Sequence, residues 1–264
     1  MSMQGGLNYQ TNVPSVLECR EKHGVNATTR QIIDALAQNP LDFDPGTRYQ
    51  YSLCHDVVAA MVEAVSGMTF SQYVQKHIIE PLEIEDLGFR PSAEQLARFS
   101  ACYRWNEEKQ QSLETDRTYN MYRFLSERYD SGGAGLFGGV TGYIRLADAL
   151  ANEGVGCTGA KILSQASIDE MRRDRLCNIH EKKFIPFQRP GYGYGLGVRT
   201  LIDPTPSRSP VGEFGWDGAA GAYVLIDPTN RLSAFYVQNV LGYTRTYYDY
   251  HPAIRDCIYE GLET

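Results

Sequence analysis

Tyr51 and Ser52 stand directly in front of a segment whose apolar residues have the spacing of a helix. The free N–H groups and the dipole at the start of a helix stabilise negative charge nearby. A phenol held there would have its phenolate form stabilised, which lowers its pKa toward values that suit proton transfer. The alternative is that the ring of Tyr51 packs on the core while Ser52 caps the helix, and local sequence alone favours this structural interpretation.

A second candidate is the stretch FGWDGAAGAYVLIDP, residues 214–228, in which glycines precede a β-rich run. Gly218 and Gly221 leave room for a ligand to approach the main chain, and the amide of Ala219 could donate to an oxyanion that develops during a reaction. The same glycines could instead relieve crowding at a sheet edge. From local sequence the two interpretations are about equally supported.

Two further patterns do not predict a cofactor site. GAGLFG, residues 133–138, has the form G-x-G-x-x-G, but a dinucleotide site needs an apolar strand before it, and the preceding FLSERYDSG is polar. We expect these glycines to form a tight turn or to let two backbone segments approach closely. The six cysteines are widely spaced, with no C-x-x-C pair and no zinc spacing, and Cys54-His55 has no companions, so free buried thiols are expected.

The elements that position these residues follow from apolar spacing. Thr28 or Thr29 can cap a helix that ends before Pro40. A stripe with an apolar residue at every fourth position predicts the helix that follows the tyrosine and serine, ending at Gly67. Its members are Leu53, Val57, Met61 and Val65.

Further along the chain the helical signals are weaker. A second helix is expected to stop at Pro81. Residues from about 90 to 130 are polar and aromatic with little periodicity, and are expected to form helices and loops. Thr141 and Ser164 are each expected to cap a helix.

After Gly191 the pattern changes to strands. YGYGLGVRTLID alternates, and AYVLIDPTNRLSAFYVQNV is two β-rich runs around the turn at residues 227–230, which predicts an antiparallel hairpin. Pro252 can open a last helix with three apolar residues, Ile254, Ile258 and Leu262, facing the sheet. Helices in the middle and antiparallel strands at the end predict an α+β fold.

Composition narrows the class of protein. The chain has 264 residues, 42% of them hydrophobic, enough to bury the core of one large domain. A net charge of −7 with scattered Lys and Arg argues against a nucleic-acid partner. The sequence has no run of 18 apolar residues and no signal-peptide pattern at its start, so no membrane segment and a cytoplasmic location are expected.

Taken in order, these segments resemble one family. MSMQGGLNY is similar to an M-T-x-G-L-x-Y segment, FDPGTRYQYSLCHDVVAAMVEAVSG to an F-x-P-G-x-x-x-x-Y-S helix, PLEIEDLGF to P-L-G-M-x-D-T-x-F, and SGGAGLFGGVTGYIRLADAL to G-G-x-G-L-x-S-T-x-x-D. GWDGAAGAYVLIDP is similar to the third motif and its strand. All belong to the serine β-lactamase-like hydrolases, which include class C β-lactamases, D-Ala-D-Ala peptidases and related esterases. The resemblance covers nearly the whole chain in collinear order.

The resemblance implies a fold and a set of roles. It implies one domain over residues 1–264, with an antiparallel sheet flanked by helices, a mainly helical part at about 20–185, and strands with a C-terminal helix at about 190–264. By resemblance, Tyr51 helps to activate a nucleophilic serine and carries a proton to the leaving group. Trp216, Asp217 and Gly218 line the substrate side, and the N–H of Ala219 is half of an oxyanion hole whose other half is the nucleophile's own amide. No metal or organic cofactor is implied.

The chain departs from the family pattern at three places. No serine is followed by lysine at the third position, and G-x-S-x-G is absent, so the S-x-x-K nucleophile is expected in a missing N-terminal segment. Leu53 stands where the family has asparagine, and His55 or Asp56 could substitute for it. Trp216 replaces a basic or histidine side chain that would recognise a substrate carboxylate. The changes at Leu53 and Trp216 favour an esterase-like or peptidase-like enzyme over an efficient β-lactamase.

The sequence therefore predicts the downstream portion of a serine hydrolase that acts on an ester or amide through an acyl-enzyme. Its expected partners are a small-molecule substrate and its own missing N-terminal segment. The alternative is a catalytically inactive relative that kept the cleft and acts as a binding protein.

Overall fold

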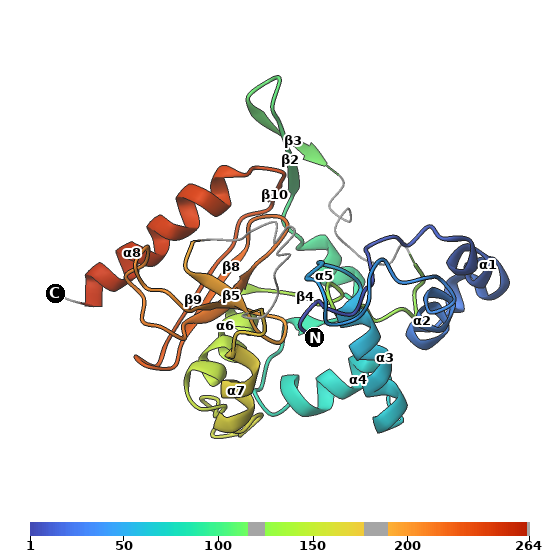
Figure 1. Ribbon diagram of the computed structural model, residues 1–264, viewed down its shortest axis with the longest axis horizontal. Coiled ribbons are helices and arrows are strands. Elements are labelled where there is room, and N and C mark those ends of the chain that lie inside the picture. Colours follow the sequence, from blue (N-terminus) through green and yellow to red (C-terminus); the bar gives the residue numbers. More distant parts are fainter. Residues whose placement is uncertain (116–124, 177–189, 263–264) are drawn as a thin grey trace.

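The centre of the fold is a five-stranded antiparallel sheet with strand order β5-β6-β7-β8-β9 (Figure 1). The structure is a computed structural model and describes residues 1–115, 125–176 and 190–262. The sheet comprises β5 (Tyr192–Tyr194), β6 (Arg199–Leu201), β7 (Phe214–Asp217), β8 (Tyr223–Asp227) and β9 (Leu232–Tyr236). The predicted hairpin is confirmed, since Asp227 pairs with Leu232 across the turn. The Asp227 carboxylate accepts hydrogen bonds from the turn amides of Thr229 and Asn230.

Helices cover both faces of this sheet (Figure 1). On one face, α6 (Val140–Ala151) and α7 (Gln165–Arg172) pack through Ala147 and Ile168 against Phe214 and Val224. On the other face, α8 (His251–Leu262), preceded by the π-helical turn η4 (Thr246–Tyr250), packs through Tyr259 on β8. Side chains alternate across a strand, so neighbouring residues of β7 and β8 face different helices.

The inward face of α8 differs from the prediction. The stripe expected to face the sheet lies half-buried or exposed, with Leu262 57% exposed. The buried residues of the helix are His251, Arg255 and Tyr259. The sheet beneath them carries acidic groups, and the Tyr259 hydroxyl donates to Asp227 at 2.8 Å. Because buried polar groups require partners, hydrogen bonding together with the packing of the Tyr259 ring sets the rotation of this helix.

The other end of the molecule is helical. It contains α1 (Pro14–His23), η1 (Gly24–Asn26), α2 (Thr29–Leu36), α3 (Cys54–Ser66), α4 (Phe70–Val74) and η2 (Gln75–Ile79). Thr28 caps α2 in a capping box with Gln31, as expected from the sequence. The helix after the tyrosine and serine ends at Gly67 in the left-handed conformation, as predicted. Its apolar stripe is buried only at the start, because Met61 and Val65 are 60% and 90% exposed.

The middle of the chain contains strands that the sequence analysis did not predict. After β1 (Leu87–Gly88) and the short α5 (Ala93–Ala97) comes a hairpin of β2 (Cys102–Asn106) and β3 (Gln111–Thr115). Strand β10 (Val240–Leu241) joins β2 in parallel, and the hairpin extends from the body of the fold (Figure 1). Strand β4 (Phe137–Gly138) pairs with β1. The expectation of only helices and loops was wrong here, because strand pairing compensates for weak local periodicity.

The two caps expected in the following segment have different outcomes. Ser164 caps α7 and accepts from the amide of Ser167. Thr141 lies inside α6, whose N-cap is Gly139, so that prediction was wrong. Among the described helices, no single one is long and apolar enough to cross a membrane; α3 and the α4–η2 segment meet that condition only together, across a 77° bend.

Candidate active site

Tyr51 lies at the centre of a stack of three aromatic rings. Its ring is parallel to Tyr9 on one side and to Trp216 on the other, with centroids 5.7 Å apart in both pairs and interplanar angles of 4° and 8°. Trp216 belongs to β7 and also meets the ring of Tyr194 edge-on at 5.4 Å. The fold therefore brings the predicted proton shuttle and the predicted substrate-side wall into direct contact.

Ser52 does not cap the helix that follows. The N-cap of α3 is Leu53, and the Ser52 hydroxyl is buried beside sulfur atoms, 3.1 Å from Cys54 Sγ and 3.7 Å from Met3 Sδ. The capping interpretation of Ser52 was therefore wrong. Tyr51 packs on the apolar cluster of Met3 and Cys54, as the structural interpretation of its ring expected, while its half-buried position leaves it at the edge of that cluster.

Two further phenols lie deeper in the same cluster. Tyr49 and Tyr194 meet edge-on at 5.1 Å, and both are buried. Burial raises the pKa of each phenol well above its ordinary value, because the charged phenolate is poorly solvated there. These two tyrosines are consequently fixed in the protonated form, and Tyr51 is the phenol of this cluster that lies nearest the surface.

The turn between β7 and β8 presents the amide of Ala219. The Gly218 N–H donates to Ala222 O at 2.8 Å, and the Gly221 N–H donates to Gly218 O at 2.9 Å, which closes a tight loop. Gly221 has a φ of +93°, and a Cβ there would collide with the side chain of Gln238, so glycine is required. Ala219 is exposed, and within the described part of the chain its N–H has no acceptor. A ligand oxygen that accepts from this amide would therefore displace no acceptor in the described residues.

The side chain of Asp217 lies on the opposite face of the sheet from Trp216. It is buried, 2.6 Å from His251 Nδ1 and 3.4 Å from Arg199 Nε. Strand alternation explains this, since adjacent residues of β7 point to opposite faces. Trp216 therefore lies on the Tyr51 side of the sheet, and Gly218 lies in the turn. The Asp217 carboxylate instead contacts His251 at the start of α8.

The two candidates for the missing asparagine point in different directions. His55 is half-buried, its Nε2 lies 3.3 Å from Met1 O, and its ring approaches Gly197 in the loop between β5 and β6. Burial lowers the pKa of His55, which favours the neutral ring. Asp56 is buried and accepts a hydrogen bond from the Tyr129 hydroxyl at 2.7 Å. His55 thus lies beside the β5–β6 loop, and its substrate contact stays a prediction.

The glycine-rich segment at residues 133–138 brings backbone against backbone. A Cβ at Gly135 would lie 2.7 Å from Ser131 O, and one at Gly138 would lie 2.6 Å from Asp86 O. Residues 125–136, directly before β4, contain no strand. The predicted close approach is confirmed, and the order of elements differs from that of a dinucleotide site.

Thiols and metal-binding groups are scattered. Five cysteines are free: Cys19, Cys54, Cys102, Cys157 and Cys257. Cys177 lies outside the described residues. In residues 1–115, 125–176 and 190–262, no group of three or more His, Cys, Asp or Glu side chains could hold a metal ion.

Sequence reasoning missed three residues near the site. Tyr9 completes the aromatic stack, and it was visible only as the last residue of the M-T-x-G-L-x-Y-like segment. Tyr247 and His251 contact the β7–β8 turn from the C-terminal helical segment. No local signal marked these two, because their partners are distant in the sequence.

The comparisons with known proteins agree with the geometry. A family model described as Beta-lactamase matches residues 1–256. The chain belongs to the beta-lactamase family. The resemblance noted in the sequence is confirmed, and so is the α+β fold.

Two curated proteins similar to the chain are longer than it is. Protein Rv1367c of Mycobacterium tuberculosis is 30% identical over 77% of this chain and 51% of its own length. Esterase EstB of Burkholderia gladioli is 30% identical over 85% of this chain and 57% of its own length. The structure of simvastatin synthase LovD from Aspergillus terreus has a TM-score of 0.75 at 21% identity, covering 98% of this chain and 67% of that protein. The chain thus spans about half the length of the first two relatives.

Proposed function

We propose that this chain carries the proton shuttle and one oxyanion donor of a serine hydrolase that cleaves an ester or amide through an acyl-enzyme. The observation that carries the proposal is the contact of Tyr51 with Trp216. Trp216 lies two residues before Gly218, where the turn that presents the amide of the exposed Ala219 begins. A phenol for proton transfer and a backbone N–H for an oxyanion are the two groups that acyl transfer requires besides a nucleophile.

The nucleophile is proposed to come from a segment outside this sequence. The 264 residues contain no Ser-x-x-Lys, and the relatives have additional length. In the proposed reaction a serine Oγ attacks the carbonyl carbon, and its proton passes to the Tyr51 and lysine pair. The oxyanion accepts from the Ala219 N–H and from the serine's own amide. When the bond to the leaving group breaks, Tyr51 returns the proton to it, and water later hydrolyses the acyl-enzyme.

The substrate is proposed to be an uncharged ester rather than an anionic β-lactam. Trp216 provides an aromatic face in the position where the family has a cationic or histidine side chain, so it offers no charge to a carboxylate. One relative at 30% identity, EstB, is named an esterase, which supports this class of substrate. Trp216 and Gly218 would form the substrate-side wall.

A second candidate function is binding without catalysis. It is favoured by one observation, the absence of Ser-x-x-Lys from the sequence. Tyr51, Trp216 and Gly218 would then hold an ester or amide ligand without turning it over.

Two measurements separate these candidates. The intact mass of the protein from its source cells should exceed 29.6 kDa, and the added sequence should contain Ser-x-x-Lys. That preparation should hydrolyse p-nitrophenyl butyrate and react with a fluorophosphonate at the serine, whereas the 264-residue chain alone should do neither. A native mass of 29.6 kDa without turnover would support the binding protein, and serine-dependent turnover by the 264-residue chain would refute the assignment of the nucleophile.

A further inference from the structure

The hydroxyl of Tyr247 contacts the peptide group that presents the candidate oxyanion amide. It lies 3.0 Å from Gly218 O and 2.8 Å from Ala219 O, and Tyr247 is buried. Burial, reinforced by the negative charge of Asp217, raises the pKa of Tyr247 to about 12. Because a carbonyl oxygen only accepts, the protonated phenol is the donor, and its single hydrogen is shared between Gly218 O and Ala219 O.

The carbonyl of Gly218 and the N–H of Ala219 belong to one peptide group. In a trans peptide the C=O and N–H bonds are coplanar and point in opposite directions. A donor that holds Gly218 O toward the C-terminal helical segment therefore directs the Ala219 N–H away from that segment. Gly218 O also accepts from the Gly221 N–H at 2.9 Å. Hydrogen bonds to a carbonyl polarise its peptide group, which makes the N–H on the other side a stronger donor.

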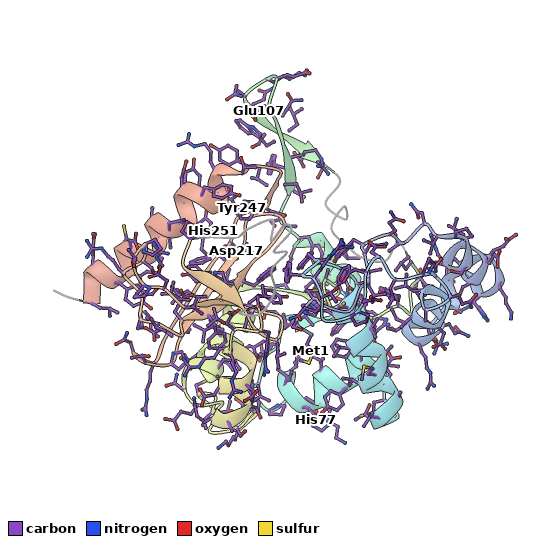
Figure 2. The ribbon with its side chains drawn as sticks, in the orientation of Figure 1. Met1, His77, Glu107, Asp217, Tyr247 and His251 are labelled. Carbon is purple, nitrogen blue, oxygen red and sulfur yellow. The ribbon has the colours of Figure 1, made fainter. Side chains whose placement is uncertain are left out.

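His251 holds the two ends of the same turn. Its Nδ1 lies 2.6 Å from Asp217 Oδ1, and its Nε2 lies 3.0 Å from Gly221 O. His251 and Tyr247 are four residues apart, and their rings meet edge-on at 5.5 Å. Figure 2 shows Asp217, Tyr247 and His251 gathered between the sheet and α8. One helical face thus contacts the residues on both sides of the exposed amide.

We propose that Tyr247 is a positioning residue, which orients and polarises the Gly218–Ala219 peptide so that the Ala219 N–H can stabilise an oxyanion. His251 fixes the ends of the turn on which this orientation depends. The inference rests on the proposed function, because only acyl transfer gives the amide an oxyanion to bind. The orientation itself can be measured without any turnover.

The first test is an NMR measurement on the 264-residue chain. Tyr247→Phe removes the hydroxyl and keeps the ring, and Tyr248→Phe is the matched control because Tyr248 is adjacent and 56% exposed. The Ala219 amide resonance should shift and its hydrogen exchange should change in Tyr247→Phe, and neither should change in the control. If Tyr247→Phe fails to fold, the same NMR measurement is made on a chain with 3-fluorotyrosine at position 247. It keeps the hydroxyl and makes it a stronger donor, so the Ala219 resonance should move by more than it does in a fluorotyrosine control at position 248.

The second test uses the native protein with an ester substrate. Tyr247→Phe should lower kcat by roughly fivefold, the rate equivalent of one neutral hydrogen bond, and leave KM unchanged, because the amide acts only on the transition state. Equal Ala219 resonances in the position-247 and position-248 variants would overturn the inference whatever the activity. An Ala219 shift in the 264-residue chain, together with no ester turnover by the native protein, would instead keep the positioning contact and reject the proposed function.

Discussion

The ring of Tyr51 lies parallel to the indole of Trp216, with centroids 5.7 Å apart and planes inclined by 8°. One residue comes from the loop before α3 and the other from β7, so the contact joins the helical part of the fold to the sheet. Aromatic pairs of this kind contribute about 0.5–1.5 kcal/mol beyond the area they bury. The stack therefore stabilises the fold, and it also holds the Tyr51 phenol beside Trp216.

Tyr51→Phe should separate these two contributions. The ring stays, so the free energy of unfolding should change by less than about 1 kcal/mol. Loss of a general acid–base group should lower kcat for p-nitrophenyl butyrate at least about a hundredfold in the native protein. The matched control is Tyr9→Phe, which removes a hydroxyl from an outer ring of the stack and should retain activity. Equal activity of the two variants would remove Tyr51 from the mechanism.

Gly221→Ala should destabilise the protein more than Gly242→Ala does. Both glycines have positive φ, +93° and +77°, so both substitutions incur the backbone cost of about 1–2 kcal/mol. A Cβ at Gly221 would also collide with Gln238, whereas one at Gly242 has no neighbour within 4 Å. Urea unfolding of both variants measures the difference. An equal decrease in the free energy of unfolding for the two variants would show that the Gln238 side chain moves aside without a free-energy cost.

Alkaline pH should destabilise the fold. Burial raises the pKa of Tyr247 from 10.0 to about 12 and raises that of Tyr259, so between these values the unfolded chain loses phenol protons that the folded chain keeps. The unfolded state then binds fewer protons, and the free energy of unfolding falls as pH rises above 10.

Unfolding by urea at pH 8, 10 and 11, with phenolate absorbance followed in parallel, would check this expectation. In Tyr247→Phe the free energy of unfolding should fall less between pH 8 and pH 11 than in the parent chain. In Tyr248→Phe it should fall by the same amount as in the parent chain. A constant urea midpoint up to pH 11 would contradict the raised pKa values of the buried phenols.

The inward face of α8 predicts a contrast between two substitutions. Tyr259→Phe removes one of the two hydrogen bonds to the buried Asp227 Oδ2, which keeps the donor Asn230 Nδ2, and should cost about 1–3 kcal/mol. Leu262→Ala alters a side chain that is 57% exposed and should cost less than about 0.5 kcal/mol. Thermal or urea unfolding distinguishes them. A larger loss for Leu262→Ala would mean that the helix faces the sheet as its apolar spacing had predicted.

Several features were determined by the sequence itself, because the interactions behind them are local. Thr28 caps α2 with a residue three positions away, and Gly67 ends α3 through its own backbone conformation. The turn that joins β8 to β9 forms because the Asp227 carboxylate accepts the amides just after it. The order of family-like segments also predicted the α+β fold.

Tertiary structure decided the features that depend on distant partners. Apolar spacing placed Ile258 and Leu262 toward the sheet, but the buried acids of the sheet face selected His251 and Tyr259. Strands β2 and β3 have weak local periodicity and form through pairing with each other and with β10. Only the fold shows that Trp216 stacks on Tyr51 while the next residue, Asp217, binds His251 behind the sheet. The physical reason is that buried polar groups and aromatic rings require specific partners, and chain folding alone brings those partners together.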